Sequence, residues 1–367
     1  MNKYKVCVYG ICKNEEKFVK RWYESMKEAD AIFVLDTGST DNTVKLLKEF
    51  GVNVRTSKIE PWRFDVARNK SLDLIPDDYD ICVCTDLDEV FEKGWRKYLE
   101  DSWVGSTSRA RYNYNWSLDD NNRPLVNFYT DKIHQRKNYK WTHPVHEVLT
   151  FLGDKENIIT IDNIVLNHYS DKSKSRGSYL PLLELSVKED PNDDRNMHYL
   201  GREYMYYGKW NECIDTLIKH LNLKSSTWKD ERCASMRFIA RSYKNLGRVE
   251  ESRMWYDKAI NEAPYLRDSY VERGILEYEL DNYKEASKYL NDALNINSHE
   301  KTYINEIFSW DNTIYDMLSI CMFYLNRIDE SLFYIDKAID MEPNNERLIN
   351  NKKIIKRYKE NNNSIWY

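Results

Sequence analysis

Three carboxylates follow directly on a short apolar run in the first quarter of the chain. The run from Ile81 to Cys84 is typical of a strand that is buried on both faces, and Asp86, Asp88 and Glu89 come just after it. Carboxylates held this close repel one another unless a cation lies between them. Hard ions such as Mg²⁺ or Mn²⁺ take oxygen ligands and often share them with substrate phosphates. The pattern therefore indicates a metal and diphosphate site, and a solvated acidic turn is the alternative.

The residues that precede and position this run alternate between strand and helix patterns. The alternation predicts right-handed crossovers and a parallel sheet. In open α/β sheets, ligands bind beyond the carboxyl ends of the strands. The strand ends at Ile11, Asp36 and Asp86 are therefore expected at one edge of the sheet. The predicted strands are 5–11, 31–35, 52–55 and 80–85, and the predicted helices are 15–27, 66–75 and a third that stops at Gly51.

Several polar residues near these strand ends are candidates for nucleotide binding. Asp36 could accept a hydrogen bond from a base or a ribose, and Arg68 could reach a phosphate. For Asp36 the alternative is an Asx-turn, and for Arg68 it is a charge on the surface of a helix. Asn14 and Asp65 are predicted to cap the helices that follow them.

The pattern changes after residue 95, where longer alternating runs predict an antiparallel half. Strands are predicted at 107–116, 126–136 and 158–166, and the stretch WTHPVHEVLTFLG from residue 141 is expected to continue as strand. Histidines accumulate here at His143, His146 and His168, with Glu147 beside His146. A neighbouring His-Glu pair could supply a base, a metal ligand or both. A hydrogen-bonded pair at a strand edge is the alternative.

From about residue 175 onward the sequence predicts consecutive helices, and it repeats. Ala240 and Gly274 are separated by about 34 residues, as are Ala259 and Ala293, which is the tetratricopeptide period. Small residues, including Gly201, are expected to permit close helix contact. An insertion at residues 298–312 is either a binding loop or an extra turn of helix. Tyrosines are expected to fill the layers between helices: Tyr204, Tyr243, Tyr256, Tyr283 and Tyr334.

Composition limits the classes of protein that this chain can be. Its 367 residues predict two domains, and a formal net charge of -5 argues against general nucleic-acid binding, which requires a basic surface. The seven cysteines include no CxxC pair and are expected to be small buried side chains in a reduced, cytoplasmic protein. We expect no signal peptide and no membrane-spanning segment, because the apolar runs are too short.

The first half resembles the family 2 glycosyltransferases of GT-A fold. The resemblance covers about 170 positions and rests on an ordered set of motifs. It is strongest with the branch that contains bacterial S-glycosyltransferases of antimicrobial peptides and some lipopolysaccharide-core transferases. The repeats resemble tetratricopeptide repeats, which usually bind peptides or mediate self-association. The implied fold class is an α/β GT-A domain with a mixed sheet at 1–172, then an all-α repeat domain at 173–367. The motifs are GICKNEE, VLDTGSTDNT, FDVARNKSL, CTDLDE, WTHPVHE and LNHYS.

The resemblance implies an inverting hexosyltransferase that uses a UDP-sugar and Mn²⁺ or Mg²⁺. The acid matching Asp36 would contact the uridine, and the DXD motif at residues 86–88 would hold ribose and metal. Many family 2 enzymes place the base in an ED-type motif that this chain lacks, so Glu147 or His146 is expected to take that role. The complete predicted set is Ile11, Asn14, Asp36, Arg68, Asp86 and Leu87 for the nucleotide, and Asp86, Asp88 and His168 for the metal.

The acceptor is expected to be a Cys, Ser or Thr side chain of a peptide or protein that the repeats present. A cysteine thiol would need little help from a base, because it ionises near neutral pH. Self-association through the repeats is also expected. One alternative is transfer to a glycan or a lipid-linked sugar. Another is a non-catalytic adaptor with a relic nucleotide-binding domain, against which the intact set of polar residues argues. A nucleotidyltransferase would need a glycine-rich basic loop that GICKNEE does not supply.

Overall fold

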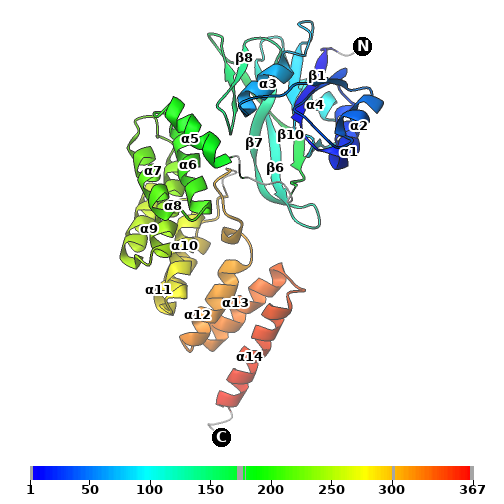
Figure 1. The fold of residues 1–367 in the computed structure, drawn as a ribbon. Coiled ribbons are helices and arrows are strands. Elements are labelled where there is room, and N and C mark those ends of the chain that lie inside the picture. Colours follow the sequence, from blue (N-terminus) through cyan, green and yellow to red (C-terminus); the bar gives the residue numbers. More distant parts are fainter. Residues whose placement is uncertain (1–2, 172–176, 178, 300–301, 364–367) are drawn as a thin grey trace. The chain divides into compact units, whose positions relative to one another are not determined.

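The computed structural model describes residues 3–171, 177, 179–299 and 302–363. The chain folds into two compact units (Figure 1). One comprises residues 1–190 with 301–303, and the other comprises residues 191–300 with 304–367. The predicted domain boundary at 172–173 lies outside the described residues and stays a prediction.

A mixed eight-stranded sheet forms the centre of the first unit, in the order β3-β2-β1-β4-β7-β6-β10-β5. Four strands at one side run parallel: β1 (Val6–Cys12), β2 (Ala31–Asp36), β3 (Asn53–Thr56) and β4 (Ile81–Cys84). The predicted parallel half is therefore confirmed. Because β1, β2 and β4 point the same way, their carboxyl ends lie at one edge of the sheet.

The other half of the sheet differs in part from the prediction. β6 (Arg109–Leu118) and β7 (Pro124–Gln135) are antiparallel as expected, but β10 (Ile158–His168) runs parallel to β6. The chain between them is long enough to cross over, because it includes β7 and a separate hairpin. That hairpin consists of β8 (Tyr139–Thr142) and β9 (Val148–Phe151), and β5 (Glu89–Phe91) pairs with β10 at the edge of the sheet.

Alternate residues of the central strands face two apolar clusters. In β1, Val8 packs in a cluster with Trp22, and the next residue, Tyr9, packs in a second cluster with Trp141. All four side chains are buried, so β1 is buried on both faces. The helices of this unit are α1 (Glu16–Met26), α2 (Thr43–Glu49), α3 (Phe64–Leu72), α4 (Trp95–Ser102) and α5 (Tyr179–Glu189).

Both predicted helix caps in the first half are wrong. Asn14 has a φ of 55° and lies one residue before the N-cap Glu15, and its side-chain oxygen accepts a hydrogen bond from the Thr40 N–H at 2.7 Å. Asp65 lies inside the first turn of α3, whose N-cap is Arg63, and it pairs with the guanidinium of that residue at 2.9 Å. In both cases the side chain that was expected to cap the helix interacts with a different group.

The second unit is a series of helix pairs, as the repeat pattern predicts. A Cβ on Gly201 would lie 2.3 Å from Leu217, and one on Gly274 would lie 2.9 Å from Leu290, so both glycines allow two helices to touch. Tyr256 is buried, and the four other predicted tyrosines are half-buried. The helices are α6 (Asp194–Tyr206), α7 (Trp210–Asn222), α8 (Lys229–Asn245), α9 (Val249–Glu262), α10 (Arg267–Glu279), α11 (Tyr283–Leu294), α12 (Thr313–Tyr324), α13 (Ile328–Met341) and α14 (Glu346–Asn363).

The insertion before α12 contains a short 3-10 helix, η1 (Ile307–Ser309), that is bound to the repeats. Asp268 of α10 accepts hydrogen bonds from the Glu306 N–H at 2.8 Å and the Ser309 hydroxyl at 2.9 Å. The Glu306 carboxylate pairs with Arg241 of α8 at 2.5 Å. The described part of the insertion is therefore an integral part of the repeat packing.

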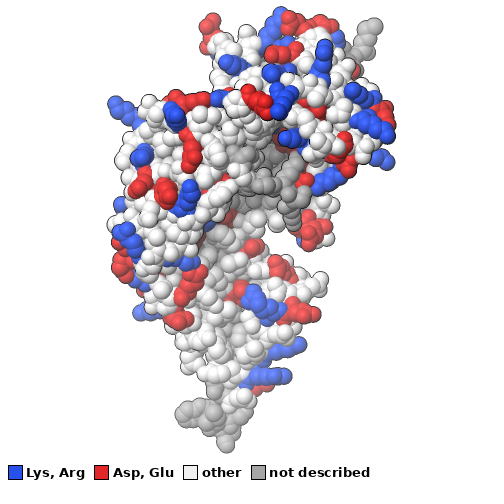
Figure 2. Space-filling view, in the orientation of Figure 1, with Lys and Arg blue, Asp and Glu red and all other residues white. Residues whose placement is uncertain are grey.

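Three further features bear on the predicted class of protein. All seven cysteines are buried and free, which confirms that they serve as small buried side chains. Within the described residues, no helix combines the length and the apolar character that a bilayer crossing requires. On the face shown in Figure 2, basic and acidic side chains are interspersed over both units, so this face carries mixed charge.

Candidate active site

The turn that follows β4 is held in place from several directions. A Cβ on Gly10 of β1 would lie 2.4 Å from the carbonyl oxygen of Thr85, so only glycine allows β1 to pass this close. The indole N–H of Trp22 donates to the Thr85 hydroxyl at 3.0 Å. The Glu89 carboxylate is buried and accepts from the Asp86 N–H at 2.9 Å. Packing therefore determines where the acidic side chains of this turn point.

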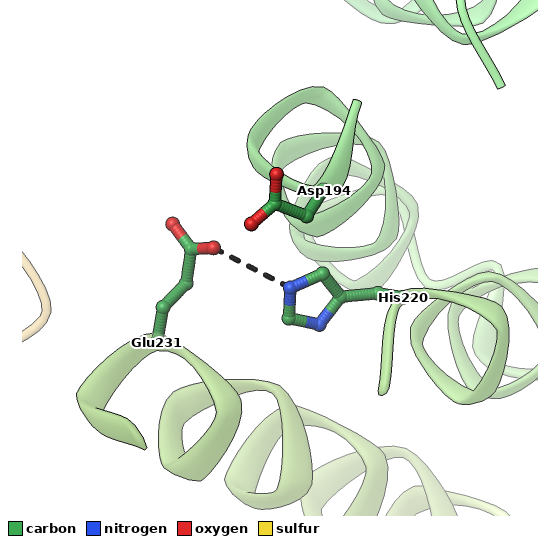
Figure 3. Close-up of side chains that lie close together, drawn as sticks. All are labelled: Asp194, His220 and Glu231. Carbon is green, nitrogen blue, oxygen red and sulfur yellow. Dashed lines mark ion pairs between the residues drawn. The ribbon is translucent and has the colours of Figure 1, made fainter. Parts of the chain in front are cut away.

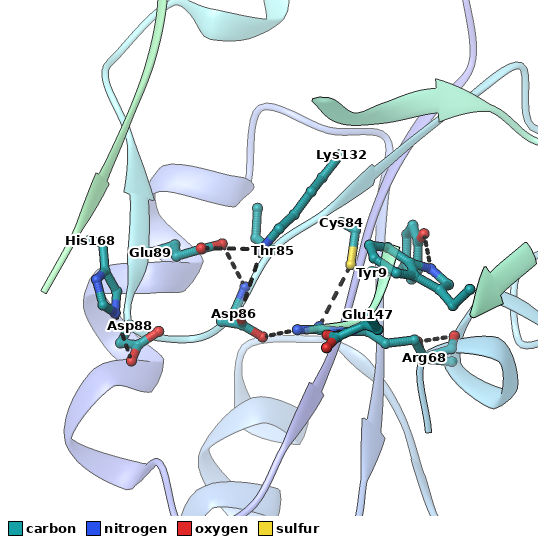
Figure 4. Close-up of polar contacts among 12 residues, drawn as sticks. Tyr9, Arg68, Cys84, Thr85, Asp86, Asp88, Glu89, Lys132, Glu147 and His168 are labelled. Atoms are coloured by element: carbon teal, nitrogen blue, oxygen red, sulfur yellow. Dashed lines mark hydrogen bonds and ion pairs between the residues drawn. The ribbon is translucent and has the colours of Figure 1, made fainter. Parts of the chain in front are cut away.

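Asp86 lies between two cations (Figure 4). Its Oδ1 is 2.5 Å from Arg68 Nη2, and its Oδ2 is 3.8 Å from Lys132 Nζ. Burial raises the pKa of Asp86, but the attraction of Arg68 and Lys132 outweighs burial and holds the pKa well below its usual value. The Asp86 carboxylate is therefore ionised and held in one orientation.

Arg68 joins Asp86 to the predicted base. Its side chain is 3% exposed, and its Nε lies 3.0 Å from Glu147 Oε1. Burial lowers the pKa of Arg68, but the attraction of Asp86 and then of Glu147 raises it well above its usual value. The alternative of a charge on a helix surface is wrong, because α3 turns Arg68 toward the sheet edge.

Asp88 and His168 form a second pair beside this network. The His168 Nδ1 is 2.9 Å from the Trp116 carbonyl oxygen, so Nδ1 carries the proton and donates it. The other ring nitrogen, Nε2, then faces Asp88 Oδ2 at 3.5 Å. Burial lowers the pKa of His168, but Asp88 outweighs burial and raises it. An unprotonated Nε2 would turn its lone pair toward a carboxylate, so either a proton or a metal ion belongs between the two side chains.

The structure separates the three predicted metal ligands into two roles. Asp88 and His168 lie together, and their nitrogen and oxygen donors fit a divalent metal ion. Asp86 is instead directed toward Arg68 and Lys132, on the other side of the turn in Figure 4. Among the residues that the structure describes, the ligand atoms of Asp86, Asp88 and His168 do not all lie within 4.8 Å of one another.

The two residues predicted as the catalytic base, His146 and Glu147, lie in the turn between β8 and β9. His143 and His146 have φ values of 77° and 50°, in the left-handed region, so this turn is tightly bent. The His146 ring lies 5.7 Å from the ring of Tyr179 in α5. The Glu147 carboxylate points the other way, toward Arg68, and its side chain is 14% exposed. Glu147 thereby joins the charged network around Asp86.

The predicted uridine contacts are placed as follows. Asp36 is buried at the end of β2 and accepts from the Gly38 N–H at 3.3 Å and the Ser39 N–H at 3.0 Å, which is the Asx-turn named as its alternative. Ile11 is half-buried near the end of β1. Leu87 is buried in the core, so it can offer a nucleotide only its main-chain groups.

Sequence reasoning missed two members of this network. Lys132 Nζ lies 3.4 Å from Glu89 Oε1, and the Tyr114 hydroxyl donates to the same oxygen at 2.7 Å. Burial lowers the pKa of Lys132, but Glu89 and Asp86 outweigh burial and raise it. Both residues come from strands of the second half of the sheet. In the sequence, Lys132 is a single lysine within a predicted strand. That pattern by itself does not indicate a functional residue.

Two family models match this chain. Residues 7–152 match the model described as glycosyl transferase family 2, and residues 238–265 and 268–300 match the tetratricopeptide repeat model. The first match contains every predicted site residue except His168. The second begins within α8 and extends past the end of α11, a stretch that contains the spacing of about 34 residues.

Named relatives match parts of the chain. The SPbeta prophage-derived glycosyltransferase SunS of Bacillus subtilis is 27% identical over 58% of this chain and 52% of its own length. The lipopolysaccharide core biosynthesis glycosyltransferase LpsC of Rhizobium meliloti is 32% identical over 26% of this chain and 36% of its own. This chain thus spans about half or less of the relatives it matches. Among solved structures, MamA aligns with 49% of this chain and 99% of its own, at 17% identity and a TM-score of 0.38.

Proposed function

We propose that this chain, a family 2 glycosyltransferase domain followed by tetratricopeptide repeats, transfers a hexose from a UDP-sugar to a nucleophile on a peptide or protein. The observation that carries the proposal is the pair of adjacent sites after β4, where Asp88 meets His168 and Asp86 meets Arg68. The domain match and the two relatives named as glycosyltransferases support the reaction type.

The two sites have complementary tasks toward the donor. Asp88 and His168 would hold a divalent metal ion, which when bound would neutralise the charge that grows on the diphosphate leaving group. Asp86, ionised and held by Arg68 and Lys132, would accept a hydrogen bond from a ribose hydroxyl. In this proposal Ile11, Asn14 and the turn after Asp36 seat the uridine.

The acceptor needs one base, because inversion proceeds by a single displacement. We assign this role to Glu147, with His146 as the second candidate. Arg68 holds Oε1 of Glu147, and Oε2 has no hydrogen-bond partner among the described residues, so it is free to take a proton. The arrangement orients the carboxylate while it leaves one oxygen for the acceptor hydroxyl or thiol.

The repeats would bind the acceptor. A cavity of about 440 Å³ in the second unit is lined mainly by aromatic and other apolar side chains, a lining that suits apolar side chains of a peptide. Its charged members Arg241 and Glu272 pair with each other. Self-association through the repeats belongs to the same proposal, and sedimentation of the full chain tests it. We also place the protein in the cytoplasm, which the seven free cysteines support.

Purified protein incubated with a panel of UDP-sugars, Mn²⁺ and candidate peptides tests the proposal. We expect UDP release and a hexose mass increment on the acceptor, and we expect Asp88→Asn to abolish both with the fold intact. Asp101→Asn, at an exposed position of α4, is the matched control. Full activity of the Asp88 variant in the presence of a chelator would exclude the assignment.

Two outcomes would favour the alternatives. Transfer to an oligosaccharide or a lipid-linked sugar, but to no peptide, would keep the reaction and change the acceptor. If calorimetry detects no binding of UDP with Mn²⁺ to the wild-type protein, the domain is a relic and the chain is an adaptor.

A further inference from the structure

A second group of possible metal ligands lies in the repeat unit. Asp194 is in the first turn of α6, His220 is near the end of α7, and Glu231 is in the first turn of α8. Each offers one ligand atom, and these atoms all lie within 4.8 Å of one another. Figure 3 shows the three side chains converging, with His220 Nε2 at 3.4 Å from Glu231 Oε1. Helices that follow one another in the chain thus meet at this point.

The imidazole of His220 is held in one orientation. It is fully buried, and its Nδ1 lies 3.0 Å from the hydroxyl oxygen of Ser235, which in turn lies 2.7 Å from His198 Nδ1. The Ser226 hydroxyl lies 3.0 Å from Nε2. Histidines that bind metals characteristically have their second ring nitrogen held by a hydrogen bond, which aims the first at the ion. Ser235 thus orients the ring so that Nε2 faces Glu231, and the Ser226 hydroxyl beside Nε2 would have to turn its proton away when an ion binds.

The charge of this group also favours a cation. Two carboxylates share the space with one imidazole, and His220 and Glu231 are buried while Asp194 is half-buried. The N-termini of α6 and α8 supply only partial positive charge, and its effect is confined to the first turn of each helix. A divalent ion bound here would be attracted by both carboxylates at once.

We propose that Asp194, His220 and Glu231 bind a divalent first-row transition metal ion, with Zn²⁺ the preferred ion. Ligand atoms of tetrahedral zinc lie about 3.4 Å apart, which is the spacing between His220 and Glu231. Asp194 is half-buried, so rotation of its side chain can close the remaining distance. One nitrogen with two carboxylates suits zinc better than Mg²⁺, which prefers oxygen alone. The ion would join α6, α7 and α8, independently of the proposed transferase site.

The test measures Zn²⁺ binding to the full chain in a background that lacks the catalytic metal pair. The protein carries Asp88→Asn and His168→Gln, is treated with chelator, and is dialysed against Zn²⁺ alone before metal analysis. We expect one tightly bound zinc per chain and a higher melting temperature with zinc than without. Adding Glu231→Gln or Asp194→Asn should remove both effects. Glu212→Gln, at an exposed position of α7, is the control and should retain both.

Cobalt supplies a second readout, because Co²⁺ in a tetrahedral site absorbs strongly in the visible range. The background protein should show these bands, and the Asp194 variant should lose them. If the Glu231 variant does not fold, the Asp194 variant decides, because its side chain is only partly buried. Absence of bound zinc in the background protein, or equal zinc in the Asp194 variant and the control, would overturn the proposal. Neither result bears on sugar transfer, because the background lacks the catalytic pair.

Discussion

At the scale of single residues, Arg68 determines the electrostatics of the candidate site. It is the one cation that contacts both Asp86 and Glu147 among the described residues, and it is almost completely buried. A buried ion pair adds little net stability when complete, but the loss of one partner leaves a charge that water cannot reach. This explains why an arginine on a helix can govern both the proposed donor site and the proposed base.

Replacing Arg68 with Met should therefore destabilise the protein and abolish transfer. We expect a loss of about 3 kcal/mol in the free energy of unfolding, because Asp86 and Glu147 lose their shared partner. Denaturant unfolding measures this change. Arg55→Met, at an exposed position of β3, should cost less than about 0.5 kcal/mol. Equal midpoints for the two variants would contradict the role assigned to Arg68.

The stability contributed by His168 should fall as the pH rises. Asp88 raises the pKa of His168 in the folded protein above the value of about 6.5 expected when the chain is unfolded. Its contribution is therefore fully present below about pH 6.5 and is lost as the pH rises through the folded value. Without metal, the difference in unfolding free energy between wild type and His168→Gln should shrink from about pH 6 to about pH 9. A constant difference would show that the Asp88 contact does not persist in solution.

At the scale of elements, the approach of β1 to the turn after β4 positions the site. A Cβ at residue 10 would overlap the Thr85 carbonyl, which lies on the backbone and cannot rotate away. The turn is also tied to α1 by the bond from Trp22 to Thr85. A small displacement of this turn would move Asp86 and Asp88 together.

Gly10→Ala should therefore impair both stability and donor binding. We expect a cost of about 2 kcal/mol from overpacking and a weaker affinity for UDP with Mn²⁺. Unfolding and calorimetry provide the two measurements. Gly105→Ala is the matched control, because a Cβ there meets no atom within 4 Å. If the two variants bind UDP equally well, the spacing of β1 and β4 does not position the site.

The insertion before α12 should stabilise the repeats through Asp268. Removing this carboxylate by Asp268→Ala leaves the Glu306 N–H and the Ser309 hydroxyl without their acceptor, at an expected cost of about 2 kcal/mol. Thermal unfolding of the full chain measures the change. Asp215→Ala, at an exposed position of α7, should leave the melting temperature nearly unchanged. A similar melting temperature for both variants would mean that the insertion is only loosely bound.

At the scale of the whole molecule, the first unit is proposed to bind the donor and the second unit to bind the acceptor. The charged network belongs entirely to the first unit, and the aromatic cavity belongs to the second. Holding two substrates in one molecule can lower the barrier by several kcal/mol, because the encounter is no longer bimolecular. Changes in the repeats should therefore alter the use of the acceptor and spare the chemistry of the donor.

A double substitution, Tyr206→Ala with Trp210→Ala, tests this division. These side chains line the cavity, and we expect the KM for the acceptor to rise roughly tenfold, as when aromatic anchors are removed from an interface. Slow hydrolysis of the UDP-sugar should not change. Phe333→Ala, an exposed aromatic of α13 outside the cavity lining, is the control. An equal fall in transfer and hydrolysis would assign the repeats a purely stabilising role.

The sequence by itself determined the parts of this protein that depend on local pattern. The apolar run before Asp86 predicted a strand buried on both faces, and the alternation of strand and helix predicted the parallel order of β1, β2 and β4. The spacing of Ala240 and Gly274 predicted the repeats. These features follow from side-chain periodicity along a short stretch of chain, which neighbours distant in sequence hardly alter.

Only the tertiary structure decided which charged groups meet. Lys132 reaches Asp86 because β7 pairs with β4, and Arg68 meets Glu147 because a hairpin outside the main sheet turns back toward α3. The group around His220 likewise exists only because three successive helices converge. Such contacts join residues that are far apart in the chain, and their partners depend on strand register and helix packing, which no local pattern encodes.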